Sequence, residues 1–157
     1  MTTAVDTNVL FDLLSPTSSR SEEARRALDE WSATGSLVVS EVVVAEASVA
    51  FATQAEMEEF FRTGGLRLIL SSAEALFVAG SAWKHYLERR PRQLICAACG
   101  TQNEVKCASC GNAIRPRQHL TPDFLIGAHA QLHAGRILTR DRGFYRSYFA
   151  GLDIVTY

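Results

Sequence analysis

Two short cysteine motifs constrain the fold of this chain more than any other feature of its sequence. The motif Cys-x-x-Cys-Gly occurs twice with six residues between the copies, at Cys96–Gly100 and Cys107–Gly111. The glycine that closes each motif permits a turn that directs backbone N–H groups at the sulfurs. The four thiolates, which we expect to converge, belong to Cys96, Cys99, Cys107 and Cys110. Four convergent thiolates are typical of a tetrahedral structural zinc site. We therefore expect a small insert over residues 92–119 that folds locally around its ion.

The insert resembles a zinc ribbon, although a very short one. It is also similar to the knuckles of rubredoxin, which hold iron, but a lone pair of knuckles without other redox groups favours zinc. The repetition of the motif at symmetric spacing argues against a redox dithiol. Two roles stay open, because the insert either only stabilises the fold or also binds RNA or a partner protein. The basic residues for such binding are Lys106, Arg115 and Arg117.

Length and composition indicate an ordinary globular chain. With 157 residues, of which 47% are hydrophobic, a single domain with a sizeable core is expected. No apolar run approaches the roughly 20 residues that span a bilayer, and the early strand around Thr3 leaves no room for a signal peptide. All cysteines lie in the two motifs, so no disulfides are expected elsewhere. These features favour a cytoplasmic location.

The net charge is −1, but arginine is concentrated in the second half of the chain. A local arginine-rich surface is compatible with a polyanionic partner such as RNA, and a simply solvated surface is the alternative. The candidates for contact with phosphate groups are Arg115, Arg117, Arg140, Arg142 and Arg146.

Outside the insert, strand-like and helix-like segments alternate. Apolar runs predict strands at residues 2–6, 37–39, 66–70, 137–139 and 153–156. Helix starts are indicated by Ser40, by capping-box spacing at Thr53/Glu56 and Ser71/Glu74, and by Thr121 before Pro122. This alternation predicts an α/β fold, a three-layer α/β/α sandwich around a mainly parallel sheet. We expect residues 1–91 and 120–157 to form one discontinuous domain that the insert at 92–119 interrupts.

Four acidic residues fall at the ends of the expected strands and helices. They are Asp6, Glu46, Asp123 and Asp141. Ligands of parallel α/β sheets bind beyond the carboxyl ends of the strands, so the four acids should meet at one edge. Carboxylates so close together repel one another unless a cation such as Mg²⁺ or Mn²⁺ binds between them. Individually, Asp6 is also explained as a helix cap, Asp123 as a helix-dipole acid and Asp141 as a turn acid. Such an explanation suits Glu46 less well, because it lies beside an apolar stripe.

The motifs that contain these acids resemble those of PIN domains, most closely the VapC-type toxin ribonucleases. The four motifs occur in the family's order, at Val5–Leu10, Ser40–Glu46, Pro122–Ala128 and Leu138–Phe144. The resemblance implies a Mg²⁺- or Mn²⁺-dependent endoribonuclease that is paired with an antitoxin protein and is often a homodimer. By motif position, Asp6, Glu46, Asp123 and Asp141 are its catalytic and metal-binding acids, and Asn8 and Thr139 are supporting polar groups. Glu41 is a rival to Glu46, but Glu46 matches the family spacing better.

The cysteine insert departs from ordinary VapC proteins. PIN nucleases that mature ribosomal RNA also carry a zinc ribbon, but there we expect it to follow the domain. Here the Asp123 and Asp141 motifs both come after it. This order favours a VapC-like protein with an insert, and leaves RNA processing as an alternative.

The expected mechanism is metal-assisted hydrolysis of RNA phosphodiester bonds. A PIN-like scaffold that binds RNA or protein without catalysis is a second hypothesis. A phosphotransfer enzyme with Asp6 as nucleophile is disfavoured, because Asn8 stands where a second carboxylate is needed. His129 and His133 lie one helical turn apart without the glutamate of a metalloprotease motif, so a packing role is expected.

Overall fold

The computed structural model describes residues 1–15, 17, 19–89, 94–95, 101–114 and 121–157. The chain folds around a five-stranded sheet with the strand order β3-β2-β1-β8-β9. Every neighbouring pair in this sheet is parallel. The strands are β1 (Thr2–Val5), β2 (Ser36–Val39), β3 (Leu66–Leu68), β8 (Arg136–Leu138) and β9 (Asp153–Val155). The three central strands β2, β1 and β8 are buried along most of their length, as expected when helices cover both faces of a parallel sheet. The edge strands β3 and β9 are more exposed.

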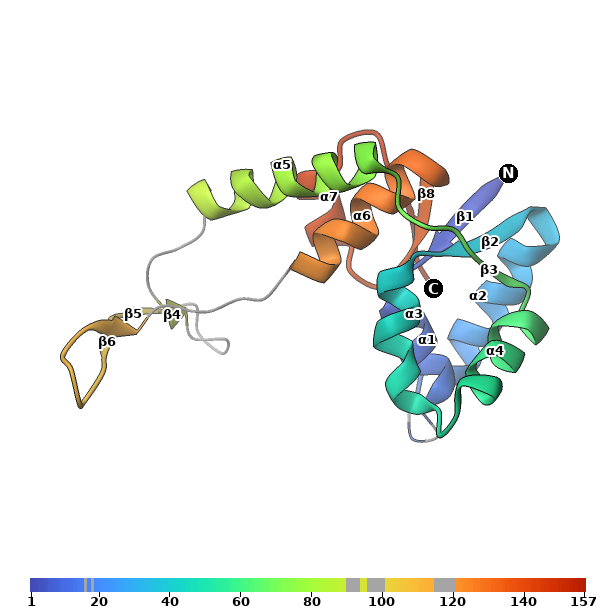
Figure 1. Ribbon diagram of the computed structural model, residues 1–157, viewed down its shortest axis with the longest axis horizontal. Coiled ribbons are helices and arrows are strands. Elements are labelled where there is room, and N and C mark those ends of the chain that lie inside the picture. The colour runs from blue at the N-terminus through green and yellow to red at the C-terminus, as the bar shows by residue number, and fades with distance from the viewer. Residues whose placement is uncertain (16, 18, 90–93, 96–100, 115–120) are drawn as a thin grey trace.

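Helices connect successive strands and flank the sheet (Figure 1). They are α1 (Thr7–Leu14), α2 (Ser21–Thr34), α3 (Glu41–Ala47), the short η1 (Ser48–Ala50), α4 (Gln54–Thr63), α5 (Ala73–Arg89), α6 (Thr121–His133) and α7 (Arg142–Tyr148). α1 packs along α2, and α5 packs along α6. The sequence-based expectation of an α/β fold with a parallel central sheet is confirmed. Among the described residues, no helix combines the length and the apolar character that crossing a bilayer requires.

The register of the sheet brings β1 and β8 together although they are far apart in the sequence. Ala4 pairs with Ile137 and Val5 with Leu138. The backbone N–H of Asp6 then donates to the carbonyl of Leu138 at 3.0 Å. The residues that follow both strands therefore leave the sheet at the same edge, because the strands run in the same direction.

Two of the expected helix caps form as predicted. Ser40 Oγ accepts a hydrogen bond from the N–H of Val43 at 3.3 Å, and Thr53 Oγ1 accepts one from the N–H of Glu56 at 3.2 Å. These bonds satisfy N–H groups that have no partner within the helix.

The expected cap at Ser71 is wrong by one residue. Ser72 Oγ accepts from the N–H of Ala75 at 3.2 Å, so Ser72 is the cap of α5, which begins at Ala73. In the expected capping box, Glu74 would accept from the N–H of Ser71. Glu41 Oε2 accepts from this N–H instead, at 3.0 Å, so a tertiary contact replaces the local one.

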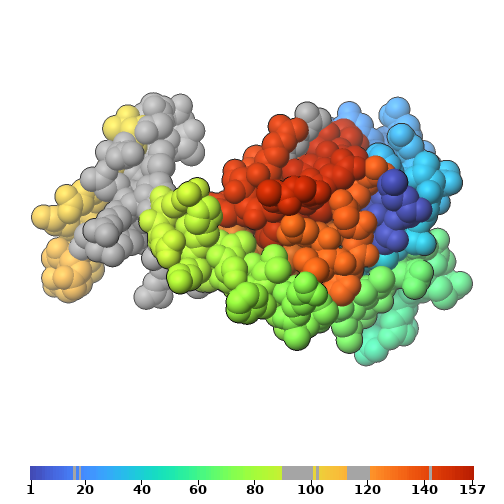
Figure 2. Space-filling model, turned by 90° about the horizontal axis from the view of Figure 1, so that it is seen from above, coloured from blue at the N-terminus to red at the C-terminus, as the bar shows by residue number. Residues whose placement is uncertain are grey.

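An aromatic cluster fixes α5, α6 and α7 against one another. Phe124 of α6 lies at its centre, with ring centroids 5.5 Å from Trp83 of α5 and 4.8 Å from Phe144 of α7. Gly127 of α6 permits the close approach of Phe149, because a Cβ atom at position 127 would lie 2.2 Å from the Phe149 ring. Figure 2 shows α5, α6 and the C-terminal segment next to one another on one face of the molecule.

Between α5 and α6, the described part of the insert contains two short antiparallel pairs. β4 (Leu94–Ile95) pairs with β5 (Gln102–Asn103), and β6 (Val105–Lys106) pairs with β7 (Ala113–Ile114). Both pairs lie beyond the adjacent ends of α5 and α6, away from the sheet (Figure 1). The division of the chain into residues 1–91, 92–119 and 120–157 stays a prediction, because several of its boundary residues lie outside the described ranges.

Candidate active site

Of the acids predicted from the sequence, two follow parallel strands of the sheet and two lie in helices. Asp6 comes directly after β1, and Asp141 precedes α7 after β8. Asp123 lies in the first turn of α6. Glu46 lies near the end of α3. The parallel β1–β8 pair brings Asp6 and Asp141 to one edge of the sheet. Glu46 and Asp123 come from α3 and α6, which contact each other.

Asp6 is the centre of a hydrogen-bond network. Its side chain is buried, with 5% of the residue exposed. Asn8 Nδ2 and Thr139 Oγ1 both donate to Oδ2 of Asp6, at 2.5 and 2.6 Å. Thr139 Oγ1 in turn accepts from Asn8 Nδ2 at 3.0 Å and from the N–H of Asp141 at 2.9 Å. The two supporting residues predicted from the sequence therefore contact Asp6 and link it to the Asp141 backbone.

Asp141 caps α7 through its side chain. Its Oδ1 accepts from the N–H of Phe144 at 3.0 Å. The sequence explained Asp141 as a turn acid, whereas the structure shows it as the cap of a helix. This cap engages one carboxylate oxygen only. It leaves the second carboxylate oxygen available for another contact, since a carboxylate accepts through two oxygens.

The acids shift one another's pKa through their charges. Burial raises the pKa of Asp6, and the charge of Glu46 raises it further. Burial, followed by the charges of Asp6, Glu46 and Asp141, raises the pKa of Asp123 to about 6. Asp123 is therefore partly protonated near neutral pH unless a cation neutralises its neighbours.

The acids open into a pocket of about 420 Å³. Its lining residues are Asp6, Thr7, Asn8, Phe11, Glu46, Val49 and Asp123. Thr7 was not expected from the sequence to take part. Its hydroxyl donates to Oε2 of Glu46 at 2.5 Å and so orients that side chain. The only signal in the sequence is its position beside Asp6.

Glu41, the rival to Glu46, faces a different part of the molecule. Its carboxylate accepts from the N–H of Ser71, and this bond helps lower its pKa although burial acts in the opposite direction. Glu46 contacts Thr7 at the pocket, whereas Glu41 serves the connection between β3 and α5. The geometry therefore places Glu46, rather than Glu41, among the acids.

Tyr145 is a second residue that the sequence did not single out. Only 1% of it is exposed, and its hydroxyl is buried without a hydrogen-bond partner of good geometry. Burial and the nearby charges of Asp6, Asp123 and Asp141 raise its pKa well above the ordinary value, so the phenol stays protonated. The hydroxyl is thus close to Asp6, although their mutual geometry falls short of a regular hydrogen bond. In the sequence, Tyr145 is indistinguishable from a core aromatic residue.

The donor set fits a hard divalent cation in its chemistry. Carboxylates that raise one another's pKa share a pocket, and oxygen ligands suit Mg²⁺ and Mn²⁺. Within the described ranges, no three His, Cys, Asp or Glu side chains are grouped tightly enough to be ligands of one ion. Binding in the expected manner therefore requires rotation of at least one carboxylate toward the others.

The candidate arginines differ in their surroundings. Arg140 Nε forms an ion pair of 3.0 Å with Oδ2 of Asp12, which also accepts from the hydroxyl of Tyr157 at 2.8 Å. This pair limits the availability of Arg140 for phosphate. Arg146 is exposed on α7. Arg142 is the first residue of α7, and its side chain lies outside the described part, as do Arg115 and Arg117 entirely.

The two histidines of α6 pack against the start of α5. His129 is buried, and its Nε2 lies 2.8 Å from the carbonyl oxygen of Ile69. His133 Nε2 accepts from the N–H of Ser72 at 3.2 Å. These contacts give both rings a structural explanation in the helix packing.

Of the four cysteines, Cys107 and Cys110 are described, whereas Cys96 and Cys99 lie outside the described residues. The turn at Cys107 is well defined, with the N–H of Gly111 donating to the carbonyl of Cys107 at 2.8 Å. Gly111 has a φ of +74°, in the left-handed region that glycine adopts readily. Hydrogen bonds from the backbone of Cys110 and Ser109 lower the pKa of the Cys107 thiol. This turn favours the thiolate form, which is the form that binds metals.

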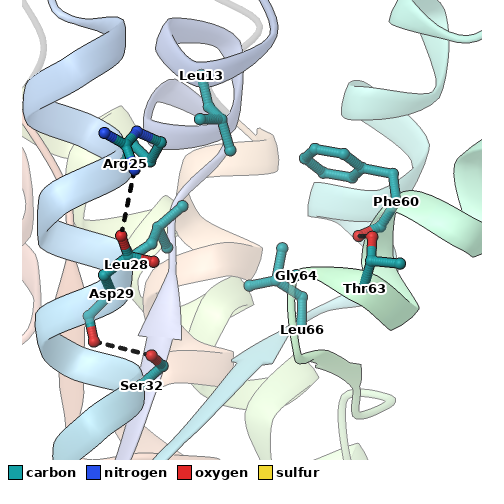
Figure 3. Close-up of a pocket in the computed structure, with 9 residues that line it drawn as sticks. All are labelled: Leu13, Arg25, Leu28, Asp29, Ser32, Phe60, Thr63, Gly64 and Leu66. Carbon is teal, nitrogen blue, oxygen red and sulfur yellow. Dashed lines mark hydrogen bonds and ion pairs between the residues drawn. The ribbon is translucent and has the colours of Figure 1, made fainter.

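A second pocket, of about 270 Å³, lies between α2 and α4 (Figure 3). Its lining includes a single acid, Asp29, which lies 3.7 Å from Arg25. Leu13, Phe60 and Leu66 make much of its wall apolar. The pocket has no convergent carboxylates, so the acid-lined pocket is the better candidate for an active site.

The geometry agrees with the comparisons to known proteins. A family model described as PIN domain matches residues 3–150. The chain therefore belongs to the PIN-domain family.

Two solved structures have a similar fold. The structure of VapBC2 from Rickettsia felis, bound to a DNA fragment from the promoter, matches with a TM-score of 0.63 and 16% identity, over 99% of this chain and 98% of the other. The structure of FitAcB from Neisseria gonorrhoeae matches with a TM-score of 0.54 and 15% identity, over 99% and 96% of the respective chains. At these identities the likeness establishes the fold. No curated protein is similar enough to count as a match.

Proposed function

We propose that this chain is a metal-dependent endoribonuclease that hydrolyses RNA phosphodiester bonds as the toxin of a VapBC-like toxin–antitoxin pair. The observation that carries the proposal is the convergence of Asp6, Glu46 and Asp123, with the charge of Asp141, at one pocket. Membership of the PIN-domain family supports nuclease activity.

Asp6, Glu46, Asp123 and Asp141 would hold Mg²⁺ or Mn²⁺ in this proposal. A bound divalent cation lowers the pKa of a coordinated water and neutralises charge on the scissile phosphate. Asn8 and Thr139 fix the orientation of Asp6, while Thr7 fixes that of Glu46. Arginines near the edge of the sheet, such as the exposed Arg146, would contact flanking phosphates.

An antitoxin protein is the proposed partner. The motif resemblance to VapC toxins supports it, as does the fold shared with chains of VapBC2 and FitAcB. A homodimer and a cytoplasmic location remain expectations of the same proposal.

The direct test replaces Asp6 with asparagine, which preserves shape and removes the charge. Asp6→Asn should lower the rate of Mn²⁺-dependent RNA cleavage by at least about 100-fold, because a ligand of the cation is lost. Asp29→Asn is the matched control, because Asp29 lines the pocket between α2 and α4. The Asp29→Asn variant should cleave RNA at the normal rate. Circular dichroism and thermal unfolding verify that both variants are folded. Undiminished cleavage by Asp6→Asn would defeat the proposal.

We further propose that Cys96, Cys99, Cys107 and Cys110 bind one structural Zn²⁺. The support is the defined turn at Cys107 and the lowered pKa of its thiol. Metal analysis of the purified chain should find about one zinc per molecule. The double variant Cys107→Ser, Cys110→Ser should lose that zinc. Its main domain should still show a cooperative thermal unfolding transition. Retention of zinc by the double variant would contradict this assignment.

A further inference from the structure

A tyrosine hydroxyl is buried beside the acidic site and has no hydrogen-bond partner of good geometry. It belongs to Tyr145 of α7, of which 1% is exposed. Buried polar groups are almost always hydrogen-bonded, because leaving one unpaired forfeits its interactions with water. An unpaired hydroxyl in the core therefore calls for an explanation.

The packing of α7 leaves Tyr145 little freedom to turn away. The helix is capped at its start by Asp141. Directly after α7, the ring of Phe149 packs against Gly127 of α6, and a Cβ atom at position 127 would clash with this ring. The ring of Phe144 lies 5.2 Å from that of Tyr145 at an interplanar angle of 82°. The position of the phenol follows from the way α7 is held against α6.

The charged groups that act on the hydroxyl are the acids of the site. Asp6, Asp123 and Asp141 all act on the Tyr145 phenol. Oδ2 of Asp6 already accepts from Asn8 of α1 and from Thr139, which follows β8. Tyr145 approaches from α7 and would add a third side-chain donor to the same carboxylate. Hydrogen bonds to an ionised carboxylate are stronger than those between neutral groups.

We propose that Tyr145 is a positioning residue of the acidic site, whose hydroxyl donates to the Asp6 carboxylate when a divalent cation is bound and holds Asp6 in the orientation that binds the cation. The inference rests on the proposed function, since it assigns Asp6 to cation binding. It extends the site from the four family motif acids to a buried aromatic residue of α7.

Tyr145→Phe tests the inference, because it removes the hydroxyl and keeps the ring. Tyr148→Phe is the matched control. Tyr148 lies in the same helix, is half-buried, and packs its ring 5.0 Å from Phe124. The full chain is titrated with Mn²⁺ by calorimetry, and thermal unfolding is measured with EDTA and with Mn²⁺. RNA cleavage supplies kcat and KM.

The Tyr145→Phe variant should bind Mn²⁺ about ten-fold more weakly, as is typical when a partner of a metal ligand is removed. Its kcat should fall by a similar factor with KM for RNA unchanged. Its Tm in EDTA should equal or exceed that of the unsubstituted chain, because an unpaired buried hydroxyl contributes no stability. Tyr148→Phe should leave Mn²⁺ affinity and kcat unchanged.

Two results would overturn the inference. One is a Tyr145→Phe variant that binds Mn²⁺ as tightly as the unsubstituted chain. The other is a Tm of the Tyr145→Phe variant in EDTA that is low enough to account for its weaker Mn²⁺ binding. In that case the role of Tyr145 would be structural. Asp6→Asn separates these failures from that of the proposed function. If Asp6→Asn keeps full Mn²⁺ affinity, the proposed function fails; if it loses the ion while Tyr145→Phe does not, only the inference fails.

Discussion

Thr139 Oγ1 donates a hydrogen bond of 2.6 Å to Oδ2 of Asp6, across 133 positions of the sequence. The same oxygen accepts from the N–H of Asp141. One hydroxyl therefore connects the end of β1 with the start of α7. Because Thr139 is fully buried, this connection is shielded from competing water.

Thr139→Val should destabilise the fold and impair the site together. Valine has the shape of threonine but neither donates nor accepts, so the Asp6 carboxylate and the Asp141 N–H each lose a partner. We expect a loss of about 1–3 kcal/mol in the free energy of unfolding, measured in urea. Thr139→Ser keeps the hydroxyl and should recover most of it. Equal stability of the valine variant and the unsubstituted chain would show that the bond is energetically unimportant.

The stability of the protein in EDTA should rise as the pH is lowered through about 6. Asp123 has a pKa of about 6 in the folded chain and an ordinary value of 3.8. Between these values the folded state holds a proton that the unfolded state has released, so acidification favours folding. The gain is complete below the ordinary pKa and is lost as the pH rises through 6.

Asp123→Asn isolates this contribution from other titrating groups. The variant should be more stable than the unsubstituted chain above pH 6, and the two should converge toward about pH 4. Differential scanning calorimetry at a series of pH values measures the difference in Tm. A difference that does not vary with pH would contradict the raised pKa.

Gly127→Ala should lower the free energy of unfolding, whereas Gly80→Ala should raise it. A Cβ at position 127 would lie 2.2 Å from the Phe149 ring, so α6 and α7 must separate or distort. We expect a loss of about 1–3 kcal/mol. At Gly80, an exposed position of α5, no atom lies within 4 Å of the added Cβ. Alanine should therefore stabilise that helix by about 0.5–1 kcal/mol. Denaturant unfolding of both variants checks the pair, and a neutral Gly127→Ala would contradict the tight packing.

Arg146→Ala should weaken RNA binding, whereas Arg140→Ala should lower the stability of the fold. Exposed Arg146 should contribute to the affinity for RNA, and its loss should reduce the slope of log affinity against log salt by about 1. Arg140 is paired with Asp12, so Arg140→Ala should instead cost about 1 kcal/mol of stability. Fluorescence anisotropy over a salt series, in the Asp6→Asn background to prevent cleavage, measures the affinity. An unchanged slope for Arg146→Ala would exclude it from the RNA contact.

Several features of the site could be inferred without a structure because they follow from local rules. Alternating apolar segments predicted the parallel sheet, and acids at the ends of its strands were expected to share an edge. Ser40 and Thr53 could be recognised as caps since capping depends on a few adjacent residues. Ser71 could not be excluded in this way, because the contact that displaces it comes from Glu41, which is distant in the sequence.

Local pattern was sufficient to identify which residue types gather at this edge: the acids, Asn8 and Thr139 all lie in short motifs at element ends. The orientation of individual side chains required the packed fold. Thr7 turns toward Glu46, Arg140 turns to Asp12, and the Tyr145 hydroxyl is buried beside Asp6. These orientations depend on contacts between segments that meet only after folding, and the periodicity of a sequence carries no information about them.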